Sequence, residues 1–140
     1  MEQFDERQKL ERGKAFQWGF FACILTDAAL CLLTTYGVAF TPYTLFVFAI
    51  WPPAAICITQ MILRDAFEKV QSSGGKIAVT VALLYGLLLV MRILIPGEAL
   101  MTGGVLANEA AILCTGLCLT LIGVVYWCKQ LRSWLGQQEK

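Results

Sequence analysis

The sequence predicts an all-α integral membrane protein, built as a bundle of four transmembrane helices with both termini in the cytoplasm. Three observations support this fold class. Hydrophobic residues make up 58% of the 140 residues and charged residues only 15%, whereas soluble domains average about 25% charged residues. The apolar residues gather in four long runs separated by polar links. Lysine and arginine are concentrated in alternate links, the pattern that orients membrane proteins.

The first predicted span covers residues 15–36 and follows a polar cytoplasmic segment, residues 1–14. At about 1.5 Å rise per residue, such a helix crosses a hydrocarbon core of about 30 Å. The run is too long for a cleavable signal peptide, so we expect it to be retained. Trp18 and Tyr36 lie near its ends, where interfacial aromatic residues are found. The charged segment before it is either a solvated extension of the helix or a docking site for a cytoplasmic partner.

The second predicted span covers residues 42–63 and contains two adjacent prolines. Thr41 and Pro42 suit the N-cap and the first helical position. Pro52 and Pro53 lack amide hydrogens, so we expect a kink near the centre of the span. Carbonyl groups freed at that depth must find donors in neighbouring helices or water. The kink either serves helix packing or forms a gating hinge or a ligand-lined bend.

The third predicted span covers residues 77–95 and the fourth covers residues 105–127. Pro96 follows the third span directly and prevents the helix from continuing. The four spans form one transmembrane domain, residues 15–128, and a polar cytoplasmic tail follows at residues 129–140.

The basic residues predict the orientation. Of the eleven lysines and arginines, all but Arg92 fall in the two polar ends and in the link between the second and third spans. These ten residues are Arg7, Lys9, Arg12, Lys14, Arg64, Lys69, Lys76, Lys129, Arg132 and Lys140. Such a bias places both termini and that link in the cytoplasm, and four spans are consistent with this orientation.

Three charged residues are predicted to lie within the membrane: Asp27, Arg92 and Glu109. Counted from the span ends, their heights above the inner boundary are about 18, 22 and 24 Å. We expect Arg92 to bind Glu109 through both arms of its guanidinium and to reach Asp27 directly or through water. The cluster is either a structural ion pair that fixes helix register or a proton- or ion-coupled site.

The residue types present argue against several chemistries. Histidine is absent, which removes the usual general base and the commonest metal ligand. No C-x-x-C motif occurs, and five of the six cysteines lie within apolar runs, where they act as small hydrophobic residues. The sequence therefore predicts no enzyme, no metal site and no cofactor. A net charge of +1 without an aromatic-rich basic cluster predicts no binding to nucleic acid.

The stretch Asp5-Glu6-Arg7-Gln8, directly before the first span, resembles the opening of an uncharacterised family of small four-helix bacterial membrane proteins. This resemblance implies a protein of the bacterial cytoplasmic membrane and supplies no catalytic residues. The four spans and Asp27 in the first are also similar to small multidrug resistance transporters, which carry a glutamate there. The double proline and the long charged ends depart from that pattern.

The sequence is compatible with two functions. The first is a non-enzymatic, multi-pass protein of the cell membrane that acts as an accessory, regulatory or immunity-type partner. The second is a small oligomeric transporter or channel that uses Asp27, Arg92 and Glu109 as an intramembrane polar site. The expected partners are the lipid bilayer and either another protein or further copies of this chain.

Overall fold

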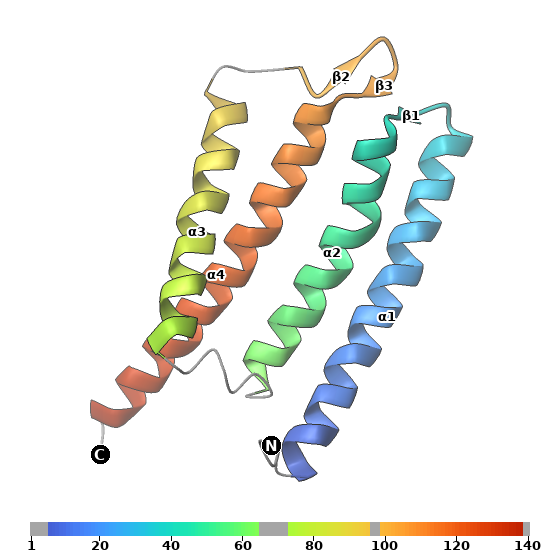
Figure 1. Ribbon diagram of the computed structural model, residues 1–140. Helices are drawn as coiled ribbons and strands as arrows, with labels where there is room; N and C mark the ends of the chain where they lie inside the picture. The colour runs from blue at the N-terminus through green and yellow to red at the C-terminus, as the bar shows by residue number, and fades with distance from the viewer. Residues whose placement is uncertain (1–5, 65–72, 96–98, 139–140) are drawn as a thin grey trace.

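The computed structural model describes residues 6–64, 73–95 and 99–138, and its fold is all-α (Figure 1). In chain order the elements are α1 (Glu6–Thr35), β1 (Ala39–Phe40), α2 (Pro42–Leu63), α3 (Ser73–Leu94), β2 (Met101–Thr102), β3 (Val105–Leu106) and α4 (Asn108–Gln138). The predicted four-helix architecture is confirmed, because each of the four helices is long and apolar enough to cross a membrane.

The four helices differ in length. Helices α2 and α3 have 22 residues each and span about 33 Å, close to the thickness of a hydrocarbon core. Helix α1 has 30 residues and α4 has 31, so each is about 46 Å long. The surplus turns lie at the N-terminal end of α1 and the C-terminal end of α4, which project on the same side (Figure 1).

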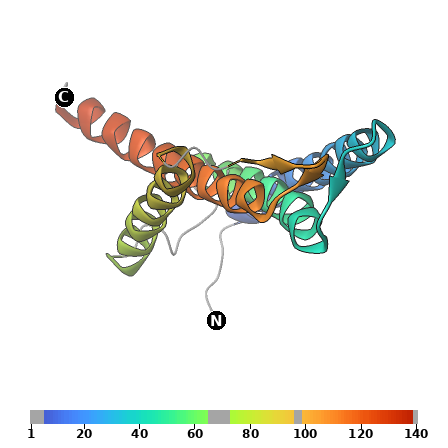
Figure 2. The ribbon, with the colours of Figure 1, turned by 90° about the horizontal axis from the view of Figure 1, so that it is seen from above.

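The helices pack side by side in the order α1–α2–α4–α3. Viewed from above, α1 and α3 lie at opposite ends of this row (Figure 2). Helices α2 and α4 run in the same direction in the centre, and each outer helix runs antiparallel to its neighbour (Figure 1). The row is open, since the main contacts of α1 are with α2 and those of α3 are with α4.

The helix bounds refine the predicted spans. Helix α2 coincides with the predicted segment 42–63. Helix α1 extends the first span back into the polar segment as far as Glu6, and α3 starts at Ser73. The predicted start of the fourth span at Val105 is wrong: Val105 and Leu106 pair as strand β3, and α4 begins at Asn108. Residues 1–5, 65–72, 96–98 and 139–140 of the predicted segments lie outside the described residues.

Helix α2 continues through both central prolines. Pro52 and Pro53 lie within one uninterrupted helix, and Pro53 is buried whereas Pro52 is half-buried. A proline removes one backbone hydrogen bond and pushes against the carbonyl one turn earlier. The helix is therefore not broken at Pro52 and Pro53. A bend of the helix axis at these residues stays a prediction.

The buried core is concentrated between the two central helices. Its main cluster consists of Ala55, Ile62, Cys118, Ile122 and Tyr126. A smaller cluster joins Ala15 of α1 to Met61 of α2. Both clusters involve the C-terminal half of α2, which contacts α4 on one side and α1 on the other.

A small β-sheet covers the opposite end of the row. Its strand order is β1-β3-β2, with β1 parallel to β3 and β2 antiparallel to β3. Gly103 and Gly104 connect β2 to β3 with φ values of 60° and 82°, the positive angles that a two-residue type I′ hairpin requires. The sheet joins the link between α1 and α2 to the link between α3 and α4.

Helix α1 ends in a Schellman motif. The Val38 amide donates to the Leu33 carbonyl and the Gly37 amide donates to the Thr34 carbonyl, both at 3.0 Å. Gly37 has φ 86°, a left-handed conformation that glycine adopts without steric strain. The motif turns the chain directly into β1.

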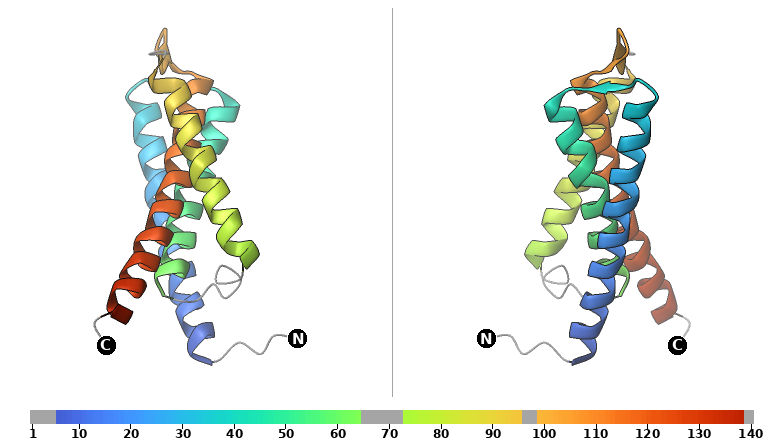
Figure 3. Two further views of the ribbon diagram at one scale, coloured as in Figure 1. Left: turned by 90° about the vertical axis from the view of Figure 1, so that its left-hand side faces the viewer. Right: turned by 90° about the vertical axis from the view of Figure 1, so that its right-hand side faces the viewer.

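Helices α3 and α4 approach each other closely at glycines. A Cβ atom on Gly86 would lie 2.8 Å from the Gly116 carbonyl oxygen, and one on Gly123 would lie 2.5 Å from the Leu83 Cβ. Side views show the two helices crossing and then diverging toward the N-terminal end of α3 (Figure 3). Small residues at a crossing let helix backbones touch without hydrophobic driving force.

We predict that Gly86→Ala destabilises the α3–α4 contact by about 1–3 kcal/mol, because the added methyl group meets backbone. Gly74→Ala is the matched control on the same helix, since a Cβ there has no neighbour within 4 Å and alanine favours the helix. Thermal unfolding in one mild detergent measures both variants. Equal stability of the two variants would contradict the close approach.

Candidate functional site

A polar cluster ties the N-terminal ends of α2 and α4 together. The Thr41 hydroxyl caps α2 by accepting from the Thr44 amide at 3.2 Å, and it donates to the Asn108 Oδ1 at 3.0 Å. The Thr44 hydroxyl lies 2.7 Å from that of Thr41 and 3.3 Å from the Ala107 carbonyl oxygen. Thr44 is fully buried, so these contacts satisfy a group that would otherwise be costly to bury.

An ion pair joins α1 to α2 at the other end of the row. The Glu11 carboxylate accepts from Arg64 at 2.7 Å and from Lys14 at 2.8 Å. Arg64 is also oriented by Gln60, whose side-chain oxygen lies 3.3 Å from the Arg64 Nε. Two cations around one carboxylate hold these helix ends together at the boundary of the apolar segments.

The Lys14 and Arg64 hydrogen bonds lower the pKa of the Glu11 carboxyl below its ordinary value, with a smaller opposing effect of burial. Glu11 lies in the polar segment ahead of the predicted first span. Because the folded pKa is lowered, this contact stabilises the fold above the ordinary carboxyl range. The contribution is lost as the pH falls through the lowered pKa.

Lys129 of α4 caps the C-terminal end of α2. Its ammonium group donates to the Ile62 carbonyl and, at 3.3 Å, to the Leu63 carbonyl. The last carbonyl groups of a helix have no partner within the helix, and a cation there also matches the negative end of the helix dipole. The α2–α4 pair is therefore held by polar contacts at both ends and by the core between them.

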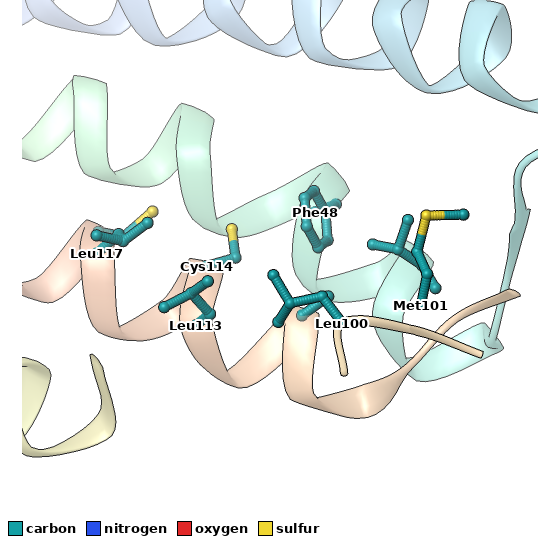
Figure 4. Close-up of a pocket in the computed structure, with 9 residues that line it drawn as sticks. Phe48, Leu100, Met101, Leu113, Cys114 and Leu117 are labelled. Atoms are coloured by element: carbon teal, nitrogen blue, oxygen red, sulfur yellow. The ribbon is translucent and has the colours of Figure 1, made fainter. Parts of the chain in front are cut away.

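An apolar groove opens on one face of the row, between α2, α4 and the β-hairpin (Figure 4). Its volume is about 520 Å³, within the range of small-molecule sites. Nine residues line it: Phe48, Leu100, Met101, Leu106, Ala110, Leu113, Cys114, Leu117 and Cys118. The lining carries no charged side chain, so the groove suits hydrocarbon.

A smaller pocket of about 210 Å³ lies between α2, α3 and α4. Arg92 of α3 lines it together with Tyr43, Tyr85, Leu89, Ile112 and Thr115. On α4, Ile112 and Thr115 lie nearly opposite the groove residues Leu113 and Leu117 at 100° per residue. The pocket therefore faces the other side of the row.

The structure does not bring the three predicted membrane charges together. Asp27 lies on α1 and Arg92 on α3, the two outermost helices of the row. No nitrogen–oxygen distance within 4.0 Å joins Arg92 to Asp27 or Glu109 among the described residues. The expected bidentate Arg92–Glu109 pair is thus not present in this chain.

Their depths differ as well. Asp27 precedes the end of α1 by eight residues, about 12 Å, whereas Arg92 precedes the end of α3 by two residues, about 3 Å. Glu109 is in the first turn of α4. Counted from the outer helix ends, the three charges therefore do not fall in one slab. Because α4 begins at Asn108, after the hairpin, Glu109 lies closer to its helix end than the sequence predicted.

Asp27 is exposed, outside the face of α1 that packs on α2 through Ala15, Ala22 and Leu30. It has no hydrogen bond or ion pair within the part of the chain that the structure describes. The predicted contact with Arg92 would have placed this carboxylate against protein. Within one copy of the chain it faces outward.

Sequence reasoning missed the contacts that hold the helix ends. Thr41 was recognised as a cap, but Thr44 and Asn108 were not singled out, since threonine and asparagine near helix starts are common. Arg64 and Lys129 were counted only for orientation. No local pattern could have paired Glu11 with Arg64, because the two residues are 53 positions apart in the chain.

The six cysteines are free thiols. Cys118 is buried in the α2–α4 core, and Cys114 lines the apolar groove beside it. No group of three or more metal-ligating side chains occurs among the described residues. No family model matches the chain, and neither the curated proteins nor the solved structures contain a match.

We predict that a double-mutant cycle of Arg92→Leu and Glu109→Leu gives a coupling energy below about 0.5 kcal/mol, the scatter of independent sites. The reason is that the two side chains form no ion pair in the chain. Thermal unfolding in one detergent at fixed pH provides the four stabilities. The cycle of Arg64→Gln and Glu11→Gln, whose charges touch, is the positive control. A coupling energy above about 1 kcal/mol between Arg92 and Glu109 would show that the two side chains do form an ion pair.

Proposed function

We propose that this chain is a multi-pass protein of the bacterial cytoplasmic membrane, with both termini in the cytoplasm. In this proposal it acts without catalysis, as an accessory, regulatory or immunity-type subunit that binds another protein or further copies of itself. The resemblance of residues 5–8 to small bacterial membrane proteins supports the compartment, although Asp5 lies outside the described residues.

Membrane insertion is supported by the outward-facing side chains of the four helices. Large apolar residues are exposed along all of them, including Phe20 and Leu25 of α1, Phe46 of α2, Leu88 of α3 and Leu121 of α4. A soluble monomer rarely exposes contiguous apolar patches larger than a few hundred Å². In a bilayer these side chains contact lipid tails, so the free-energy cost of exposing them to water is avoided.

Orientation is supported by where the described basic residues lie. Apart from Arg92, they lie at the end of the row that holds the chain termini: in the first turns of α1 and α3, at the end of α2 and in the last third of α4. A cytoplasmic position for this end follows from the positive-inside rule.

The observation that carries the partner function is the exposure of Asp27. An ionised carboxylate at this depth costs at least about 2.5 kcal/mol against lipid. Within one chain no neighbouring helix covers it, because α1 is at the edge of an open row. A protein surface packed on the outer face of α1 removes this cost by supplying a polar contact.

The projecting end of α4 offers a second contact surface. Leu131, Trp134 and Leu135 are all more than half exposed and follow the i, i+3, i+4 spacing of one helix face. They lie beyond the length that a bilayer core would cover. An apolar helical stripe of this kind fits a groove on a partner protein.

The alternative is a small oligomeric transporter or channel. The same outward position of Asp27 favours it, since a carboxylate at an edge could line a pathway formed between copies. Arg92 and Glu109 would then act near the outer mouth rather than beside Asp27, because both lie close to helix ends.

We predict that a reporter enzyme active only outside the cytoplasm gives no signal when fused after Lys140. The reason is the clustering of basic residues at the end of the row that holds both termini. A fusion within the hairpin at Gly103 is the positive control and should be active. Activity of the C-terminal fusion equal to that control would overturn the orientation.

We predict that a photo-crosslinking side chain at Ile24, which is 50% exposed and lies one turn before Asp27 on the same side of α1, yields a discrete protein adduct in native membranes. The same group at Ala55, which is 1% exposed, is the buried control and should yield none. Mass spectrometry of the adduct separates a second copy from a different protein.

The transporter alternative predicts a different result in proteoliposomes. Uptake driven by a pH gradient that Asp27→Asn abolishes, together with adducts only to the chain itself, would defeat the accessory function. Absence of any protein adduct at exposed positions along α1 would refute the proposed partner.

A further inference from the structure

We propose that the pocket around Arg92 binds the headgroup of a net-anionic phospholipid in the outer leaflet. The pocket is formed by three helices, with Tyr43 from α2, Tyr85 and Arg92 from α3, and Thr115 from α4. Its volume of about 210 Å³ is small, so it accommodates a headgroup and the first methylene groups rather than a whole lipid. The proposal rests on the membrane insertion proposed above.

Arg92 is available to bind an anion. Its side chain is exposed, and among the described residues it forms no hydrogen bond or ion pair, including with Glu109 on α4. A guanidinium presents five donors in a planar fork that matches phosphate oxygens. Arg92 is also the one described cation at this end of the row, so a phosphate here has no competing basic site nearby.

The position of the pocket selects a lipid rather than a dissolved anion. Tyr43 is the second residue of α2 and Arg92 precedes the end of α3 by two residues, so both lie at the outer ends of their helices. Tyr43 is 53% exposed, and tyrosine is favoured at headgroup depth. Tyr85 precedes Arg92 by seven residues and so lies about 10 Å deeper in the pocket. Leu89 and Ile112 form an apolar part of the lining, which suits the start of an acyl chain.

Competition between two lipids with identical acyl chains tests the proposal. The intact protein in mild detergent is mixed with equal amounts of phosphatidylglycerol and phosphatidylcholine, and native mass spectrometry records which lipid is retained. We expect phosphatidylglycerol to be preferred, and Arg92→Gln to reduce this preference about fivefold, the effect of one basic residue at an anionic surface. Arg132→Gln, the same change on an exposed arginine at the other end of the molecule, should leave it unchanged.

Two further variants keep the test decisive if Arg92→Gln does not fold. Arg92→Lys keeps the charge but loses the planar fork, so its preference should lie between those of the wild type and Arg92→Gln. Tyr43→Phe removes one hydroxyl donor at the outer end of the pocket without changing charge and should also weaken the preference. If both variants kept the wild-type preference for phosphatidylglycerol, the proposed site would be refuted.

Other outcomes distinguish the sources of the anion. Displacement of phosphatidylglycerol by millimolar glycerol 3-phosphate would assign the pocket to a soluble phosphate and refute the lipid. Equal preference in the wild type and Arg92→Gln would refute the pocket altogether. A chain recovered in the soluble fraction without detergent would instead refute membrane insertion, which the lipid competition does not address.

Discussion

The parallel contact between α2 and α4 is the constraint on which the rest of the structure depends. At one end Thr41 and Thr44 bind the start of α4 through Asn108 and the Ala107 carbonyl. At the other end Lys129 binds the last carbonyl groups of α2. The Lys129 contacts satisfy carbonyl groups at the end of α2, which have no partner within the helix, and the threonine contacts satisfy the buried Thr44 hydroxyl. Helix α1 packs on the outer side of α2, and helix α3 packs on the outer side of α4.

This arrangement explains why the charged residues do not cluster. With α2 and α4 in the centre, α1 and α3 are separated by the width of two helices. Arg92 therefore faces a pocket formed with α2 and α4, and Asp27 faces outward from α1. The two faces of the row differ as well: one carries a purely apolar groove and the other carries the Arg92 pocket. The open row therefore presents two chemically different faces and an exposed carboxylate at one edge.

The sequence by itself determined the number of helices, their apolar character and the end of the molecule that carries most of the basic residues. These properties depend on local composition and periodicity, so they can be read without knowing which helices touch. The cap at Thr41 and the position of α2 were readable for the same reason: capping and proline placement act within a few residues. The helical extension to Glu6 was also open to sequence reasoning, as one of two interpretations of that segment.

Only the tertiary structure decided which helices are neighbours, and the functional interpretation of the charges depends on that order. The three links between consecutive helices permit several arrangements, and between transmembrane helices no hydrophobic gradient would select one. The choice is made by close contacts such as Gly86 against Gly116 and by polar pairs between distant segments, such as Glu11 with Arg64. Helix α4 also begins later than the sequence predicted, because Val105 and Leu106 belong to the hairpin at Gly103 and Gly104. Strand pairing depends on a partner elsewhere in the chain, so it could not be read locally. Depth along a helix is a local property, whereas proximity between helices is not.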